Sequence, residues 1–190
     1  MSHPFFAMLS RMRYINRWGL MRNTFQENIQ EHSHQVAVLA HALAVIQNRF
    51  YGGQIDPGAV AVAALYHDAS EILTGDMPTP IKYDNPEIKA AYKQVEAMAE
   101  QKLLSMLPEE LRCDFDEAVT IPDPEVHAIV KAADKLSAYI KCVEEQKAGN
   151  TEFDSAAKQS MEAMLQMDMP ELHWFIANCL EPFGLNIDQP

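Results

Sequence analysis

Two adjacent polar residues, His67 and Asp68, stand inside the most apolar predicted helix of the chain. The stretch from Val60 to Leu65 before them is nearly all apolar, which is typical of a buried helix. An unpaired charge buried there would cost several kcal/mol, so a compensating partner is required. A divalent cation is such a partner, because imidazole nitrogen and carboxylate oxygen are suitable ligands for Mn, Co, Fe, Zn and, less well, Mg. The pair therefore indicates a metal site.

The remaining ligands must come from other segments, because adjacent helical residues point about 100° apart. His32 and Asp134 are the candidates: each lies in a predicted helix, and Asp134 follows the small residues Ala132 and Ala133, which permit close helix packing. Glu71 lies one turn beyond the His-Asp pair and projects to the same helix face. We expect it to act as an acid or base beside the metal rather than as a ligand.

The other histidines are less suitable as ligands. His34 is two residues from His32 and points nearly the opposite way on a helix. We interpret His34, His41, His127 and His173 as structural or exposed. Without a second ligand set, the sequence favours a mononuclear site.

These residues need helices to position them, and the sequence predicts an all-α bundle. Apolar residues recur at helical spacing almost throughout, and alternating β-type runs are nearly absent. Asp56 and Pro57 are typical of a helix start, and Gly75 marks the end of that helix. The prolines at 78 and 80 predict a rigid, non-helical loop over 76–80, and 17–26 is a second expected loop. The expected helices cover about 4–15, 28–49, 57–74, 86–107, 124–147, 152–167 and 170–180.

The length and composition predict one domain. A chain of 190 residues, 48% of them hydrophobic, can bury a single core. We expect one domain over 1–190, with a metal-binding core at about 28–147, an arginine-rich N-terminal helix and loop at 4–26 and C-terminal helices at 152–180. No run is long enough to span a membrane, and no signal peptide is evident. Three widely spaced cysteines, Cys113, Cys142 and Cys179, favour reduced thiols in the cytoplasm.

The charge argues against a nucleic-acid polymer as a partner. A formal net charge of -12 would repel a phosphate backbone. Residues 1–26, however, contain Arg11, Arg13, Arg17 and Arg22 and no acidic residue. A small anion could be bound there, although solvated or ion-paired arginines are the alternative interpretation.

The motifs together resemble a known enzyme family. The segments are N-R-W at 16–18, E-H-S at 31–33, Y-H-D-A-S-E at 66–71, L-T-G-D-M-P-T-P at 73–80 and A-D-K-L-S-A-Y-I-K-C at 133–142. They are similar to those of the bacterial HD-domain 5'-deoxynucleotidases, within the HD superfamily of metal-dependent phosphohydrolases, from about residue 5 to about residue 150. The resemblance implies an HD-type helical bundle and suggests a homodimer.

The resemblance also implies roles for residues. It makes His32, His67, Asp68 and Asp134 the metal ligands and Glu71 the catalytic acid or base. Arg17 would orient the phosphate, Trp18 would pack against the sugar where a 2'-hydroxyl would sit, and the loop from Asp76 to Thr79 would grip the nucleoside. The implied substrate-contacting set is Arg17, Trp18, His32, Asp68, Asp76, Met77, Pro78, Thr79 and Asp134.

The function predicted on this basis is metal-dependent hydrolysis of deoxyribonucleoside 5'-monophosphates, selective against ribonucleotides. One divalent ion per subunit, Co, Mn or another transition metal, would be the cofactor. Two alternatives remain open: an HD phosphohydrolase of another nucleotide, such as a cyclic nucleotide, a triphosphate or an alarmone, and a non-catalytic nucleotide-binding regulatory module. One arginine beside the metal favours one phosphate over three, and a pure binder would not need Glu71.

Overall fold

The fold is all-α, as predicted. The computed structural model describes residues 2–82, 85–186 and 188, and within these ranges it contains helices, an isolated bridge between Asn16 and Asn28, and no β-strand. The helices are α1 (Phe5–Leu9), η1 (Ser10–Tyr14), α2 (Ile29–Phe50), α3 (Pro57–Tyr66), α4 (Glu71–Thr74), α5 (Thr79–Lys82), α6 (Pro86–Leu104), α7 (Glu109–Thr120), α8 (Pro124–Lys147), η2 (Thr151–Phe153), α9 (Asp154–Leu165), α10 (Pro170–Cys179) and η3 (Glu181–Gly184).

Side-chain caps begin the helices that carry the predicted site. The side chain of Asn28 accepts hydrogen bonds from the amides of Gln30 and Glu31, and the carboxylate of Glu31 accepts one from the amide of Asn28, which completes a capping box. Asp56 caps α3, and Asp123 caps α8; in both, a proline occupies the start of the helix. The predicted starts of α3 and α8 are confirmed.

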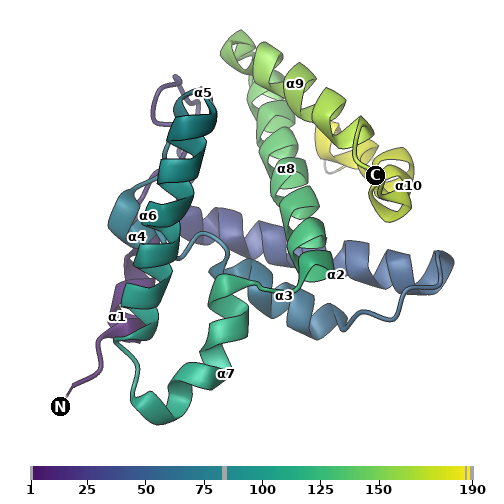
Figure 1. Cartoon of the computed structure of the whole chain (residues 1–190). Helices are drawn as coiled ribbons and strands as arrows, with labels where there is room; N and C mark the ends of the chain where they lie inside the picture. The colour runs from purple at the N-terminus through teal and green to yellow at the C-terminus, as the bar shows by residue number, and fades with distance from the viewer. Residues whose placement is uncertain (1, 83–84, 187, 189–190) are drawn as a thin grey trace.

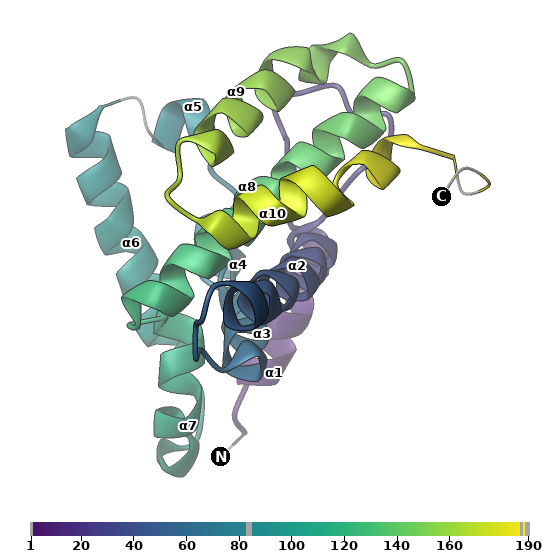
Figure 2. The same ribbon diagram turned by 90° about the vertical axis from the view of Figure 1, so that its right-hand side faces the viewer.

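The core is built around α2, which packs against α3, α8 and α10 (Figure 1). α9 packs along α8 and α10 lies against α2 (Figure 1 and Figure 2), whereas α6 and α7 extend away on the other side of the molecule. A smaller apolar cluster joins α1 to α6 and α7. The main cluster includes Val36, Leu39, Leu43, Val60, Leu136, Ile140 and Leu172. The core thereby holds α2, α3 and α8, whose first turn, C-terminal end and middle, respectively, carry or adjoin the predicted ligands.

The predicted helix over 57–74 is wrong, because α3 ends at Tyr66 and the chain turns before α4 begins at Glu71. The amides of Ala69 and Glu71 bond to carbonyls three residues earlier, at 2.8 and 3.0 Å, in place of the α-helical pattern. The stop signal at Gly75 belongs to α4. The turn re-aims His67 and Asp68 relative to α3, so the two need not diverge as they would on one straight helix.

Other predicted boundaries also differ. The predicted helix over 4–15 is a short α1 followed by a 3-10 helix over 10–14, and the one over 86–107 ends at Leu104. The sequence analysis missed α7, whose apolar residues Leu111, Phe115 and Val119 recur every four residues. The loop over 76–80 is non-helical only to residue 78, because Pro80 occupies the first turn of α5, where its missing N–H leaves no bond unmade.

Among the residues described, no helix has the length and hydropathy needed to cross a membrane. The division of the chain into one domain stays a prediction.

Candidate metal and phosphate site

The structure brings the four predicted metal ligands together from three segments. His32 lies in the first turn of α2, His67 and Asp68 in the turn after α3, and Asp134 in the middle of α8. The side-chain ligand atoms of His32, His67 and Asp68 lie within 4.8 Å of one another. Asp134 joins them from the rim: its Oδ1 atom is 3.1 Å from Nε2 of His32, and its side chain is 39% exposed. The arrangement could hold one cation with two nitrogens and two carboxylates.

The tautomers of both histidines follow from the partners of their Nδ1 atoms. In His67, Nδ1 is 2.7 Å from the carbonyl oxygen of Ala64, which can only accept, so Nδ1 carries the proton. In His32, Nδ1 is 3.1 Å from Oγ of Ser137, whose hydroxyl already donates to Gln35, so Nδ1 donates here too. In the neutral rings, the lone pair of Nε2 therefore faces the site. A hydrogen bond from the ring nitrogen that faces away from the ion is typical of histidine metal ligands.

These Nε2 atoms are buried and make no hydrogen bond within the protein. The Nε2 of His67 is 3.2 Å from Oδ2 of Asp68, and that of His32 is 3.5 Å from the same oxygen. These distances fall within ion-pair range, but the alignment is not that of a hydrogen bond. Nitrogen lone pairs converging with carboxylate oxygens fit a cation, which would satisfy all of them at once.

The carboxylates are ionised, as metal ligands must be. Burial favours the neutral form of Asp134, but the adjacent ring of His32 and the charge of Arg17 hold its pKa at about 2. For Asp68, burial is outweighed by His67, His32 and Arg17, which hold its pKa well below the usual range. Burial disfavours the charged form of His67, yet Asp68 raises the pKa of its ring. A metal ion would bind the neutral form of that imidazole, so protonation of the ring would compete with metal binding.

Glu71 is the third acidic group of the site, and its pKa shifts in the opposite direction to the pKa values of Asp68 and Asp134. Its side chain lies at the start of α4, the residue is 6% exposed, and Oε2 makes no hydrogen bond within the protein. Burial, with the negative charges of Asp68 and Asp76, raises its pKa to about 9. Glu71 thus holds a proton at neutral pH, and a nearby divalent cation would lower its pKa toward neutrality. Such a group is suited to proton transfer.

Arg17 lies among three carboxylates. Its Nε is 3.1 Å from Glu27, its Nη1 3.3 Å from Asp68 and its Nη2 3.9 Å from Asp134, and its side chain is 12% exposed. Burial disfavours its charge, but Asp68, Asp134 and Glu27 outweigh that effect and raise its pKa above the ordinary value. The two terminal nitrogens therefore face the ligand cluster, where a phosphate would meet them.

Trp18 follows Arg17 in the chain, and two contacts hold its indole ring. Its indole Nε1 donates to Oε2 of Glu27 at 3.1 Å, and its ring packs against Phe153 with centroids 5.2 Å apart. Burial raises the pKa of Asp76, and Arg17 lowers it, so Asp76 lies within electrostatic reach of the cluster. Of the remaining predicted loop residues, Met77 and Pro78 are half-buried and Thr79 is exposed. Their contact with a nucleoside stays a prediction.

Sequence reasoning missed three supporting residues. Ser137 and Gln35 each lie three residues after a predicted ligand, Asp134 and His32, so helical spacing could have indicated them. Glu27 had no such signal, because its contacts with Arg17 and Trp18 depend on how the chain folds back before α2.

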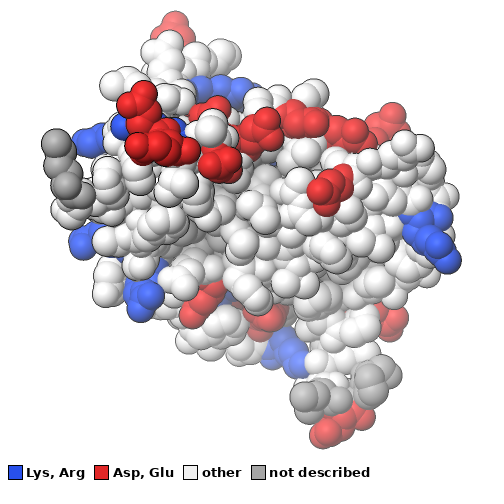
Figure 3. All heavy atoms as spheres, turned by 90° about the horizontal axis from the view of Figure 1, so that it is seen from below, with Lys and Arg blue, Asp and Glu red and all other residues white. Residues whose placement is uncertain are grey.

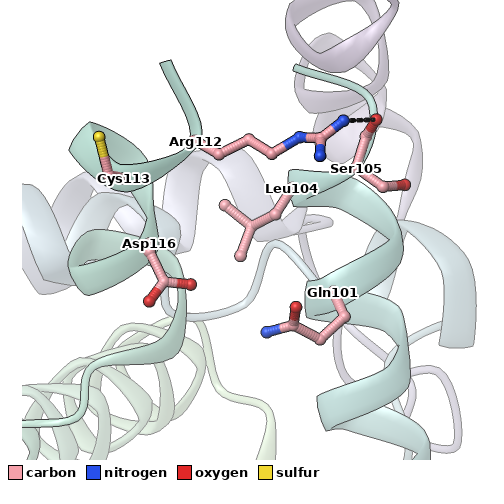
Figure 4. A pocket seen from close by; sticks show the side chains of 6 residues that line it. All are labelled: Gln101, Leu104, Ser105, Arg112, Cys113 and Asp116. Carbon is pink, nitrogen blue, oxygen red and sulfur yellow. Dashed lines mark hydrogen bonds between the residues drawn. The ribbon is translucent and has the colours of Figure 1, made fainter. Parts of the chain in front are cut away.

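A separate hollow lies between α6 and α7 (Figure 4). It encloses about 320 Å³ and is lined by Gln101, Leu104, Ser105, Arg112, Cys113 and Asp116. In it Arg112 donates to the carbonyl of Ser105 at 3.3 Å. No predicted ligand lines this hollow, so we do not assign it to the metal site.

Solved structures define the class of the fold. The chain is similar to an HD-domain phosphohydrolase from Listeria innocua, with a TM-score of 0.83 and 21% identity over 95% of this chain and 88% of that one. It is also similar to a cyanophage S-2L HD phosphohydrolase bound to dA and one catalytic Zn2+ ion, with a TM-score of 0.67 and 23% identity over 92% of this chain and 95% of that one. At these identities the likeness concerns the fold, which is that of the HD phosphohydrolases.

The particular family follows from the sequence comparison. The model of the YfbR-like 5'-deoxynucleotidases matches residues 4–183. A 5'-deoxynucleotidase of Vibrio cholerae is 51% identical over 187 residues, 97% of this chain and 96% of that one. One of Yersinia pestis is 50% identical over 193 residues, 100% of this chain and 96% of that one. The chain belongs to the YfbR-like 5'-deoxynucleotidase family, and the predicted family, fold class and enzyme class are confirmed.

Proposed function

We propose that this protein hydrolyses deoxyribonucleoside 5'-monophosphates to a deoxyribonucleoside and phosphate, with one divalent metal ion held by His32, His67, Asp68 and Asp134. The observation that carries the proposal is the pair of buried Nε2 atoms that face ionised carboxylates and make no hydrogen bond. Both rings are oriented by Nδ1 partners, as metal ligation requires.

The residues around this cluster supply the rest of the chemistry. A bound ion would polarise the phosphoryl group and make water more acidic. Water adds to phosphorus, the bond from phosphorus to the 5' oxygen breaks, and one proton passes from the water to that oxygen. We assign this proton transfer to Glu71, which would take the proton from water or give it to the leaving oxygen, and its raised pKa supports the assignment. Arg17 stabilises the phosphoryl oxygens with its planar guanidinium.

The ligand set suits a transition metal, and we infer Co, Mn or another metal of this series. Two imidazoles with two carboxylates are softer than the oxygen shells preferred by Mg. The cyanophage relative carries Zn2+, which supports a transition metal here.

Selectivity against ribonucleotides is assigned to Trp18. Its ring is held from two sides, by Glu27 and Phe153, and so cannot easily yield to an added 2'-hydroxyl. A hydroxyl buried against an apolar ring without a partner costs about 1 to 3 kcal/mol. The loop from Asp76 to Thr79 is the proposed contact for the nucleoside part of the substrate, and the dA bound to the cyanophage protein supports a substrate that contains a deoxynucleoside.

The test is phosphate release from dAMP and AMP, side by side, by metal-stripped protein to which Co, Mn, Mg or Zn is restored singly. We expect metal-dependent release from dAMP and little from AMP. Equal release from both would contradict the sugar selectivity. Release from neither, with metal still bound, would contradict the proposed substrate and favour another phosphoester or a binding module.

We also infer a homodimer, formed by a second copy of this chain. α2 and α3 pack side by side and expose Val38, Val45, Val62 and Leu65 to solvent. The centre of the face seen from below, on the side where α3 lies, is mostly uncharged (Figure 3). Sedimentation velocity should show a particle of two chains, and Val62→Glu should shift it to one; a wild-type monomer would contradict the inference.

The proposed location is the cytoplasm. The three cysteines are free, as expected in a reducing compartment.

A further inference from the structure

We propose that Glu27 is a positioning residue that aligns the phosphate-binding and sugar-contacting side chains as one unit. The inference rests on the roles proposed above for Arg17 and Trp18. Neither the sequence motifs nor the family resemblance assigns a function to Glu27.

A single oxygen of Glu27 joins the two side chains. Its Oε2 accepts a hydrogen bond from Nε of Arg17 and another from Nε1 of Trp18, each at 3.1 Å. The side chain of Glu27 is only 12% exposed, so little water competes for the carboxylate. Because both donors share one acceptor, a displacement of either ring or guanidinium is transmitted to the other.

The backbone reinforces the same pairing. The amide of Arg17 donates to the carbonyl of Glu27 at 2.9 Å, and the amide of Ile29 donates to Ile15 at 3.0 Å. These bonds flank the bridge between Asn16 and Asn28. Glu27 thus holds Arg17 by main chain and side chain together, immediately before α2 delivers His32 to the cluster.

The conformation of Trp18 needs such a restraint. Its φ of 60° lies in the left-handed region, which is unusual and strained for a bulky residue. The carbonyl of Trp18 accepts from the amide of Met21 at 2.9 Å and from Asn23, which fixes the turn. Those bonds restrain the backbone, whereas the bond to Glu27 fixes the indole itself.

Glu27 also determines which nitrogen atoms of Arg17 stay available to bind a substrate. By binding Nε, it leaves Nη1 and Nη2 directed at Asp68 and Asp134. Without Glu27, the guanidinium could turn its whole edge to these two proposed metal ligands and compete with the cation for them. Glu27 therefore keeps Arg17 close to the cluster but only partly engaged with it.

The far end of the segment is anchored independently of Glu27. The amide of Thr24 donates to Glu145 at 2.9 Å, and Lys141 donates to the carbonyl of Phe25 at 2.8 Å. A change at Glu27 should therefore disturb the two side chains that it holds without releasing the whole segment from α8.

The experiment compares Glu27→Leu and Glu27→Gln with Glu152→Gln as the matched control. Glu152 also pairs with an arginine of the same segment, Arg22, at 2.6 Å, but on the solvent side. Phosphate release from dAMP and AMP gives kcat, KM and the selectivity for deoxyribose. Acrylamide quenching in a Trp174→Phe background isolates the fluorescence of Trp18, because these are the two tryptophans of the chain.

We expect Glu27→Leu to lower kcat/KM for dAMP by about tenfold to a hundredfold, the weight of a hydrogen bond to a charged group. The preference for dAMP over AMP should fall, and quenching of Trp18 should increase. Glu27→Gln keeps the shape of the side chain and a neutral acceptor, so it should show the same changes to a smaller extent. If Glu27→Leu does not fold, Glu27→Gln alone tests the positioning role of Glu27. Glu152→Gln should match the wild type.

Unchanged selectivity and unchanged quenching in the Glu27 variants would overturn the inference. If the wild-type protein releases no phosphate from dAMP, the proposed function fails. In that case the quenching of Trp18 still tests whether Glu27 restrains the indole ring, because this measurement needs no turnover.

Discussion

Two regions of this protein bury charged groups, and they treat them in opposite ways. At the C-terminal half of α8, the ammonium of Lys141 donates to Glu145 at 2.5 Å and to the carbonyl of Phe25 at 2.8 Å. Glu145 also accepts from Thr24 at 2.9 Å and from Asn150 at 2.8 Å. The two buried charges, Lys141 and Glu145, are thus paired with each other within the chain.

The metal cluster is the contrasting region. There Nε2 of His32, Nε2 of His67 and Oε2 of Glu71 are buried without a hydrogen bond. The difference between the two regions is clearest in the pKa values of Glu145 and Glu71. Hydrogen bonds from Lys141, Asn150 and Thr24 outweigh burial and lower the pKa of Glu145 to about 2, whereas burial and neighbouring negative charge raise that of Glu71 to about 9. A buried polar group that is hydrogen-bonded within the protein stabilises the fold. A buried polar group without a hydrogen bond can instead bind a ligand or transfer a proton.

The largest expected effect, and the sharpest test of this contrast, is on turnover. Glu71→Gln keeps the shape of the side chain but cannot exchange a proton, so kcat for dAMP should fall by about 10²- to 10⁴-fold. Metal binding, measured by calorimetry, should persist. Glu100→Gln is the control, because Glu100 also has a raised pKa, of about 7, but lies on α6 away from the cluster. A normal kcat in Glu71→Gln would remove Glu71 from the mechanism.

The next effect concerns stability in the paired region. Lys141→Met leaves Glu145 buried without its cation, so the free energy of unfolding should fall by about 3–5 kcal/mol in a denaturant titration. Lys141→Met combined with Glu145→Leu should recover part of this loss, because the unpaired charge is gone. If the single variant is as stable as the wild type, the region is not held by its charge pair.

The third effect is the pH dependence of metal affinity. A protonated imidazole cannot be a ligand, and Asp68 raises the pKa of His67, so affinity should weaken as pH falls. The expected loss is up to about tenfold per pH unit below that pKa. Calorimetric titration with Zn or Co at about pH 8 and about pH 5.5 measures it. The same dependence should remain in His127→Gln, which changes an exposed histidine, and a pH-independent affinity would argue against His67 as a ligand.

The last expected effect is on the stability of the metal-free protein. The pKa of Glu71 is higher in the folded state, about 9, than its ordinary 4.5, so ionisation opposes folding as pH rises from 4.5 toward 9. Glu71→Gln should therefore have the higher Tm at alkaline pH, by about 2–4 °C per kcal/mol, and lose this advantage near pH 4.5. Glu145→Gln should behave in the opposite sense, because the low pKa of Glu145 stabilises the fold above pH 4.5. Equal Tm values for Glu71→Gln and wild type at pH 9 would contradict the difference between the regions.

The sequence by itself determined what depends on near neighbours along the chain. Capping by Asp123 and Pro124 predicted α8 with its observed bounds, and helical periodicity predicted the all-α fold. The types of the proposed ligands also follow from sequence, because a His-Asp pair after an apolar run requires compensation. These signals act over a few residues, where spacing decides which side chains meet.

Tertiary structure alone decided which distant groups share the site. The turn after Tyr66 follows from hydrogen bonds to carbonyls three residues back. The tautomer of His32 depends on Ser137, 105 residues away, and the pairing of Arg17 with Asp68 spans 51 residues. The role proposed for Glu27 can be recognised only from the folded chain, in which the segment before α2 lies against Arg17. Contacts of this kind depend on the packing of α2, α3 and α8 as a whole, and no local periodicity encodes them.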